Sequence, residues 1–405
     1  MNPSSSGWIE KYIFILEKES PTIPFPSSKK FYSALREVGF VYGFSVRTVF
    51  VHDFSNVVLT EEEILKVNTL HALLFTYFQY HPDTSYDDGI KNILVFYKNL
   101  IQKKSGFSMK LPLGFSKSKD LEQILSQRVE KNKALEKYNF ERIMTYALLF
   151  IDVLAYQFYL KGGKKSDTYA EAIEVIILQV CYLALQAKNK KTAYDVLLID
   201  LFKASEKYAT KETNQTITLE TIDFNLLSTA TEKQYVLDLC CLAVWNDFKV
   251  EESEISFLNS LCEKLGLPLK SASESLEVLK TFAAENATSV HLFQYKHPVK
   301  QLYTQSTKTV KLLILRNKNR LVKELSQSKE LLVLLGKSTY SDLNAEEKNK
   351  VKEQLLDVCK TIPSLTIFLL PGGSLLLPLL VKFIPQLLPS AFDDNKIPKK
   401  LGGKK

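Results

Sequence analysis

A hydrophobic segment near the end of the chain, interrupted by prolines, is the feature that most restricts how the chain can fold. Residues 362–388 read IPSLTIFLLPGGSLLLPLLVKFIPQLL and contain one charged side chain, Lys382. As a continuous helix this segment would reach about 40 Å and could cross a hydrocarbon core of about 30 Å. Prolines recur near every seventh position, at Pro363, Pro371, Pro378, Pro385 and Pro389. Because each proline removes a backbone donor and clashes with the preceding turn, we expect a broken membrane segment rather than the core helix of a soluble protein.

The charges that flank this segment favour a hairpin over a single span. Lysines lie on both sides of it, at Lys348, Lys350, Lys352 and Lys360 before it and at Lys396, Lys399, Lys400, Lys404 and Lys405 after it. Positive charge on both flanks favours keeping both on the cytoplasmic side. We therefore expect a re-entrant or interfacial helical hairpin that turns at Pro371, Gly372 and Gly373. A single span and a buried hairpin in a soluble unit are the alternatives.

The rest of the chain predicts a globular, all-α body. The whole chain of 405 residues is 45% hydrophobic and has a mean hydropathy of −0.07, values that are typical of a mostly globular protein. Its length is enough for two or three domains. Strict alternation of apolar and polar residues is scarce, and long stretches rich in Leu, Lys and Glu separate the 14 glycines and 14 prolines. The five cysteines have no framework spacing, and the start of the chain has no secretory or transit pattern, so we expect reduced, buried thiols in a cytoplasmic setting.

Local signals predict individual helices. Thr60 is a plausible N-cap, with Glu63 completing a capping box, for a helix that runs to Tyr80. Residues 140–160 are apolar nearly all round, and we interpret them as a buried core helix rather than a span, since Asp152 would be costly in a bilayer. Further helices are expected at 86–103, 119–138, 170–186 and 192–207, with a linker at 209–221.

We expect five regions: an N-terminal helical region (1–138), a central helical region (139–225), a helical module (226–290), a basic amphipathic connector (291–340) and the hydrophobic segment with its Lys-rich tail (341–405).

Residues 231–267 form a second recognisable unit. One helix is expected to end near Trp245, and another to start at Val250 and end at Gly266, which Pro268 follows. The unit resembles the TerB-like helical module of tellurite-resistance and DjlA-type proteins, whose signature is an Ala-Asp-Gly turn with a Glu seven residues after the Asp. Asp247 and Glu254 match that pattern, whereas Phe248 replaces the glycine. The resemblance implies an interaction module.

Asp247 and Glu254, together with Glu251 and Glu252, could also bind a divalent cation through oxygen ligands. We expect no metal there, because acids are favoured in the first turn of a helix by its dipole.

Positive charge is concentrated just before the hydrophobic segment. The net charge is +8, and residues 299–337 alone contain nine Lys or Arg and two acids. We expect an amphipathic helix over 299–323 with apolar positions at Leu302, Val310, Leu313, Ile314, Leu321 and Leu325. Its basic surface would consist of Lys308, Lys311, Arg316, Lys318, Arg320 and Lys323. Such a surface suits an anionic lipid leaflet or ribosomal RNA, and lysine dominance argues against specific DNA reading. The alternative is a solvated face that packs on the body.

No arrangement of residues predicts catalysis. The run from Gly336 to Thr339 resembles the end of a phosphate-binding loop, but the upstream glycine is replaced by Leu331, so we expect Gly336 to cap a helix instead. The five histidines lack zinc-protease spacing, and no nucleophile lies beside a base in the sequence. We expect no enzyme activity, no cofactor, no catalytic residue and no small-molecule substrate.

The C-terminal sequence resembles one known family. The resemblance is carried by residues 343–348 (LNAEEK) and by a pattern of Pro371, Leu376, Leu377, Pro378, Lys382, Pro385, Leu388, Pro389, Ser390 and Phe392. It is similar to the LETM family, membrane proteins of the mitochondrial inner membrane with bacterial relatives, which the resemblance links to cation/proton exchange and to ribosome binding. Ser374 stands where the family usually has Glu. The family's ribosome-binding domain would follow this segment, so we expect it to be missing from a chain that ends at Lys405.

These observations together predict an all-α, non-enzymatic scaffold of bacterial LETM-like type on the cytoplasmic face of the inner membrane. Anionic lipid and the ribosome, or another protein, are its expected partners. The alternative is a component of a cation/proton exchange system, against which the loss of the family's carboxylate at Ser374 counts.

Overall fold

The fold is described by a computed structural model. It describes residues 1–19, 27–50, 59–102, 117–129, 147–191, 195–196, 199–200, 202, 216–245, 250–287, 307, 310–311, 313–315, 317–362, 365 and 377–388. These residues form helices and no strand, which confirms the all-α prediction. The expected helix at 192–207 lies mostly outside the described residues, as do the first half of the linker and the end of the helix at 119–138.

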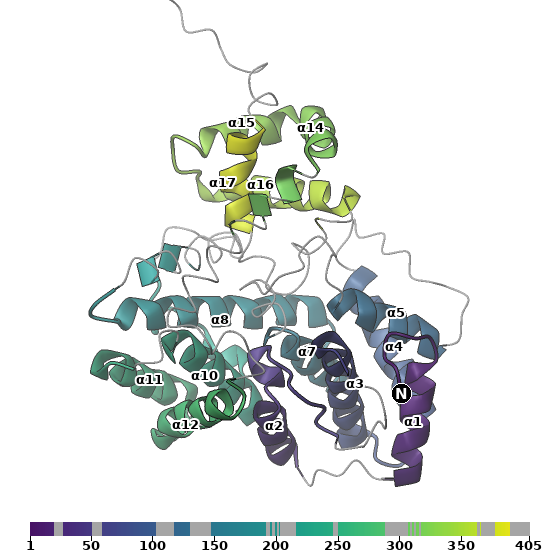
Figure 1. The fold of residues 1–405 in the computed structure, drawn as a ribbon. Helices are drawn as coiled ribbons and strands as arrows, with labels where there is room; N and C mark the ends of the chain where they lie inside the picture. The colour runs from purple at the N-terminus through teal and green to yellow at the C-terminus, as the bar shows by residue number, and fades with distance from the viewer. Residues whose placement is uncertain are drawn as a thin grey trace, which may run out of the picture.

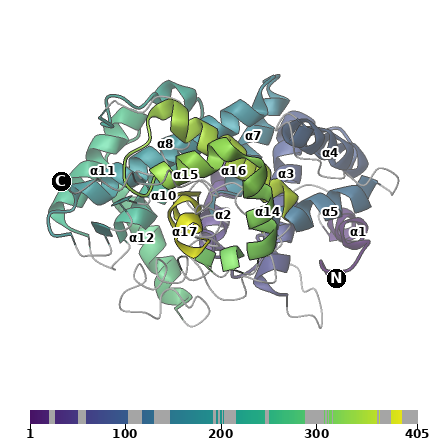
Figure 2. The same ribbon diagram turned by 90° about the horizontal axis from the view of Figure 1, so that it is seen from above.

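Helices α1 to α12 form the body of the molecule, and Figure 1 shows α14 to α17 gathered in a separate group above them. The body contains α1 (Trp8–Glu19), α2 (Ser28–Glu37), η1 (Phe40–Tyr42), α3 (Glu61–Tyr80), α4 (Tyr86–Gln102), α5 (Lys117–Val129), α7 (Phe150–Leu160), α8 (Ser166–Ala187), η3 (Phe224–Leu226), α10 (Ala230–Val244), α11 (Glu252–Leu265) and α12 (Lys270–Glu285). The second group contains α14 (Lys318–Gln327), α15 (Lys329–Lys337), α16 (Ala345–Thr361) and α17 (Leu377–Leu387). Seen from above, this group lies over the middle of the body (Figure 2).

The body has two ends that α7 and α8 join. At one end α3 packs on α4, α5 and α7, and at the other α10 packs on α11 and α12. The long helix α8 contacts α7, α10 and α11 and so ties the two ends together. Its buried side chains include Ile173, Ile177 and Cys181. Among the described residues α8 is the one helix long and apolar enough to cross a membrane, by length and composition alone.

The expected helix boundaries are confirmed where local capping signals fix them. The Thr60 side chain accepts a hydrogen bond from the amide of Glu63 at 3.3 Å, while the Thr60 amide donates to the Glu63 carboxylate at 2.8 Å. This is the reciprocal arrangement of a capping box at the start of α3. At the end of α11, Gly266 has φ +64° and closes the helix as expected, because glycine adopts the left-handed region without steric cost.

The apolar helix with Asp152 is a core helix, as predicted. Its described part, α7, packs against α3 and α8, and Asp152 is 1% exposed. The Asp152 carboxylate accepts hydrogen bonds from Arg128 Nε at 2.9 Å, from a second Arg128 nitrogen and from the Tyr97 hydroxyl at 3.1 Å. A buried charge is tolerated only when it is paired and hydrogen-bonded, so this carboxylate belongs to an ion pair that links α5 to α7.

A second buried ion pair joins α2 to α10. Asp238 is fully buried and lies 3.0 Å from Arg36, and it accepts hydrogen bonds from the Tyr32 hydroxyl at 2.7 Å and from Gln234 at 3.1 Å. Burial raises the pKa of Asp238 above its ordinary value, and the Arg36 charge opposes that rise. Gln234 also donates to Ser275 of α12 at 2.8 Å, so one network connects three helices. Nothing in the local sequence around Asp238 indicates its partner, which lies about 200 residues earlier.

Candidate functional site

The four C-terminal helices share a leucine-rich core, and we refer to α14–α17 as the C-terminal unit. Each helix buries an apolar stripe against its neighbours, with α15 in contact with α14, α16 and α17. The stripe residues are Leu321 and Leu325, then Leu331 and Leu335, then Val351 and Leu355, and finally Leu380 and Ile384, all fully buried. Apolar residues at spacings of three or four fall on one helical face, so the burial follows directly from the sequence. The apolar positions expected in the basic connector are also buried where they are described, at Val310, Leu313, Ile314, Leu321 and Leu325.

The basic stretch is not one continuous helix, which corrects the expectation. In its described part, α14 begins at Lys318 after the N-cap position Asn317, and the chain breaks again at Ser328 before α15. The Ser328 hydroxyl accepts a hydrogen bond from the amide of Leu331 at 3.3 Å and donates to the side-chain oxygen of Gln354 at 2.7 Å. Serine at this position is a strong N-cap, and this signal could have located the break in the sequence.

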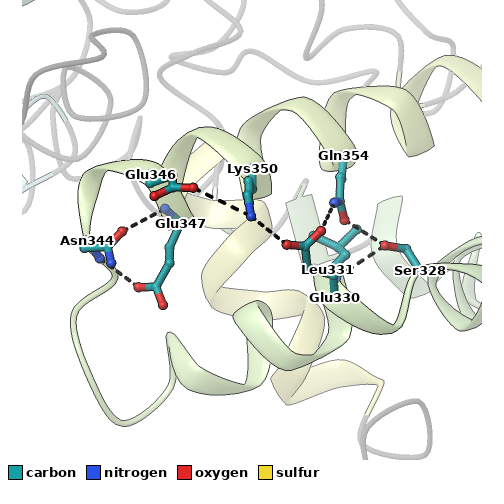
Figure 3. Close-up of polar contacts among 8 residues, drawn as sticks. All are labelled: Ser328, Glu330, Leu331, Asn344, Glu346, Glu347, Lys350 and Gln354. Atoms are coloured by element: carbon teal, nitrogen blue, oxygen red, sulfur yellow. Dashed lines mark hydrogen bonds and ion pairs between the residues drawn. The ribbon is translucent and has the colours of Figure 1, made fainter.

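Polar contacts fix α15 against α16 near both ends of the pair, and Figure 3 shows those around Lys350. The Glu330 carboxylate accepts hydrogen bonds from Lys350 at 3.0 Å and from Gln354 at 2.9 Å. Near the other end of α15, Lys337 donates to Glu347 at 2.6 Å. The hydrogen bond from Lys350 lowers the pKa of Glu330, and that from Lys337 lowers the pKa of Glu347. Contacts at both ends of α15 define its alignment with α16.

Asn344 caps α16 and completes a capping box. Its side-chain oxygen accepts from the Glu347 amide at 2.9 Å, and its own amide donates to the Glu347 carboxylate at 2.9 Å (Figure 3). Loss of such a cap typically costs about 1 kcal/mol. We expect Asn344→Ala to reduce the hydrogen-exchange protection of the first turn of α16 by about that amount. Asn349→Ala, in the same helix but away from the cap, is the matched control, and equal protection in the two variants would contradict the capping role.

Positive charge is neutralised on α16 but not on α14. Helix α16 contains four lysines and four acids, and Lys350 and Lys360 lie within ion-pair distance of carboxylates. Helix α14 contains Lys318, Arg320 and Lys323 against the single acid Glu324. These three cations are exposed, and none takes part in the ion pairs found between described residues. Of the six residues expected in the basic surface, Lys318, Arg320 and Lys323 are exposed and Lys311 is partly buried, while Lys308 and Arg316 lie outside the described residues.

Two lysines that are distant in the sequence meet at one aromatic ring. The Lys311 ammonium lies 4.6 Å from the centroid of the Phe383 ring, and the Lys382 ammonium lies 5.6 Å from it. Both distances fall within the range of cation–π attraction. Lys311 was expected in the basic surface and Lys382 in the membrane segment, so the fold brings together residues that the sequence assigned to two different regions.

The described part of the hydrophobic segment is a packed helix rather than a broken one. Pro378 lies in the first turn of α17, where a missing amide costs nothing, and Pro385 lies within its last turns. The helical hydrogen bonding continues past Pro385, because the Leu388 amide donates to the Ile384 carbonyl at 3.0 Å. The expectation that both prolines break the helix is therefore wrong. Pro371, Gly372, Gly373 and Pro389 lie outside the described residues.

The candidate metal residues and the phosphate-loop remnant have structural roles where they are described. Glu254 is fully buried and accepts a hydrogen bond from the Glu251 amide at 2.8 Å, at the start of α11, while Asp247 lies outside the described residues. No group of three or more His, Cys, Asp or Glu in the described part of the chain could hold a metal ion. Gly336 lies inside the last turn of α15, and Ser338 is the C-cap, so the expectation that Gly336 caps the helix is wrong.

Comparison with known proteins gives one family match. The family described as LETM1-like, RBD, a ribosome-binding domain, matches residues 343–402, which are 60 of the 405 residues and begin just before α16. The match supports the LETM-like resemblance, and it corrects the expectation that the family's ribosome-binding domain is missing. Neither the comparison with curated proteins nor that with solved structures gives a match.

Proposed function

We propose that this chain is a ribosome-binding helical scaffold of LETM-like type that also associates with a membrane. The observation that carries the proposal is the match of residues 343–402 to a ribosome-binding domain. The matched residues include α16 and α17, which belong to a separate helical unit that exposes unneutralised positive charge. The ribosome surface is dominated by anionic RNA, to which such a unit is complementary.

Within this proposal the body supplies the scaffold and the partner-specific contacts. Helices α10 to α12 lie in the region expected to form a TerB-like module; they pack on one another, and α10 and α11 also pack on α8. A helical module of this kind suits protein partners rather than a small-molecule reaction. A cavity in the body, lined by residues such as Tyr32, Phe75 and Phe150, has a volume of about 30 Å³, which is room for only one or two water molecules.

The proposed membrane association is supported by the apolar segment at 362–388. The proposed location is the cytoplasmic face of a bacterial inner membrane. The side chains Leu380, Phe383 and Ile384 of α17 are buried within the C-terminal unit. Insertion of this helix into lipid would therefore require its release from α15. Flotation of the purified chain with anionic vesicles tests this part of the proposal, and recovery of the chain only from the bottom of the gradient would contradict it.

Sedimentation with ribosomes tests the proposed function itself. The purified full chain should pellet with bacterial ribosomes through a sucrose cushion at low salt. The amount bound should reach a plateau as the chain is added in excess over ribosomes. Binding should weaken as salt rises, because contacts to RNA phosphates release counterions. A chain that stays in the supernatant at every salt concentration would show that the match at 343–402 does not confer ribosome binding.

A further inference from the structure

We infer that the C-terminal unit binds the phosphate backbone of ribosomal RNA through α14 and through the Lys311–Phe383–Lys382 site, and not through α16. We call the exposed side chains Lys318, Arg320 and Lys323 the α14 cations, and Lys311 and Lys382 the ring lysines. This inference rests on the proposed ribosome binding, and it names the chemical partner and the face that meets it. Both parts of this face lie outside α16, the helix with which the family match begins.

The distribution of charge over the unit selects this face. The four lysines of α16 are balanced by four acids on the same helix, and Lys350 is further shared between Glu330 and Glu346 at 3.0 and 3.8 Å. A lysine that already pairs with a carboxylate must give up that partner to bind a phosphate. The α14 cations have no such competitor among the ion pairs of the described residues, so a phosphate can meet them without breaking any of those pairs.

The exposed side of α14 offers hydrogen-bond donors as well as charge. Leu321 and Leu325 are buried and define the inner side of the helix. Arg320 and Lys323, three positions apart, lie next to each other on the surface, and Asn319 and Gln327 are exposed beside them. Arg, Lys, Asn and Gln are the side chains that most often contact nucleic-acid phosphates. The helix therefore presents a set of donors suited to a chain of phosphates.

The ring lysines provide a second, independent sign of an anionic partner. The Lys311 and Lys382 ammonium groups lie 4.6 and 5.6 Å from the centroid of the same ring, so two positive charges gather at Phe383. The attraction of each for the Phe383 ring holds them in place, and no carboxylate of a described residue forms an ion pair with either. A phosphate that docks beside this ring would be attracted by the positive charge of both lysines. Because Phe383 is only 5% exposed, the ring is a fixed support for this pair.

The same features favour RNA over a lipid surface. A helix that lies in a membrane interface presents large apolar side chains next to its cations. On α14 the leucines face the core of the unit, and the side that carries the cations is polar. Phosphates of RNA need only charge and donors, whereas stable binding to lipid would need an apolar contribution that the exposed side of α14 does not offer; Leu315, which precedes α14, is a single exposed leucine.

The test compares charge-neutral variants of the full chain for binding to ribosomes, to ribosomal RNA stripped of protein, and to vesicles that contain phosphatidylglycerol. The first variant is Lys318→Gln, Arg320→Gln and Lys323→Gln together, and the second is Lys311→Gln with Lys382→Gln. The control removes the same charge from exposed positions of the body, as Lys11→Gln, Lys29→Gln and Lys280→Gln. Thermal unfolding followed by circular dichroism establishes that each variant is folded.

Loss of the α14 cations should weaken binding to ribosomes and to stripped RNA by about tenfold or more at low salt. Each lost phosphate contact lowers the slope of log affinity against log salt by about 0.7 to 0.9, so the slope should fall by about two to three. The ring-lysine variant should lower it by about one to two, and the control should bind like the unchanged chain.

Three results would overturn the inference while leaving ribosome binding intact. The first is an unchanged affinity and salt slope in both variants. The second is a loss of affinity for ribosomes without a loss for stripped RNA, which would indicate a ribosomal protein as the partner. The third is a loss of affinity for vesicles alone, which would indicate lipid as the partner. If the unchanged chain binds neither ribosomes nor stripped RNA, the inference and the proposed function both fail.

Discussion

Replacement of Asp152 by alanine is expected to lower the free energy of unfolding of the body by about 3 to 5 kcal/mol, because it leaves the buried Arg128 guanidinium without its partner. Asp152 is 1% exposed and accepts hydrogen bonds from Arg128 and from the Tyr97 hydroxyl. Tyr97 is fully buried as well, so its hydroxyl would also lose its acceptor. Urea denaturation followed by circular dichroism measures the effect as a shift of the transition midpoint.

A double variant separates the cost of an unpaired charge from the worth of the ion pair. Asp152→Leu combined with Arg128→Met removes both charges, and replacing a buried pair by apolar residues is often close to neutral. We therefore expect the double variant to be markedly more stable than Asp152→Ala. If Asp152→Ala costs less than about 1 kcal/mol, the carboxylate is not buried in an ion pair and the assignment of α7 as a core helix is wrong.

The body could be predicted from the sequence wherever a local signal fixed the structure. The capping box of Thr60 and Glu63 and the glycine at 266 marked helix ends that the structure confirms. The charge at Asp152 within an apolar run indicated a buried core helix rather than a membrane span. The partner of that charge, Arg128, could not be predicted, because pairing between helices depends on packing and leaves no trace in the spacing of either helix.

The C-terminal unit was predicted less well, for two physical reasons. Hydropathy alone does not distinguish a membrane segment from a helix buried by its neighbours, and α17 is covered in the unit by contacts that include α15. The meeting of Lys311 with Lys382 at Phe383 joins residues about 70 positions apart, so no pattern within either segment could reveal it. In contrast, the start of α15 could have been predicted from the sequence, because serine at position 328 is a favourable N-cap residue.

Removal of residues 288–405 is expected to abolish binding to ribosomes while leaving the body folded. The main helix packing of the C-terminal unit is among α14 to α17 themselves, and the body has its own core across α3, α7, α8 and α10. The truncated chain should therefore keep the helical content and cooperative unfolding of the body. Full-length Asp152→Ala, which weakens the body but keeps the C-terminal unit, is the matched control and should still bind ribosomes at temperatures where it is folded.

Sedimentation of the full chain and of residues 1–287 with ribosomes, side by side at low salt, is the most direct test of the claim that the C-terminal unit is the ribosome-binding part. We predict that the full chain pellets with ribosomes and that residues 1–287 remain in the supernatant, although both are folded. Equal pelleting of the two chains would place the binding surface in the body and would contradict the claim.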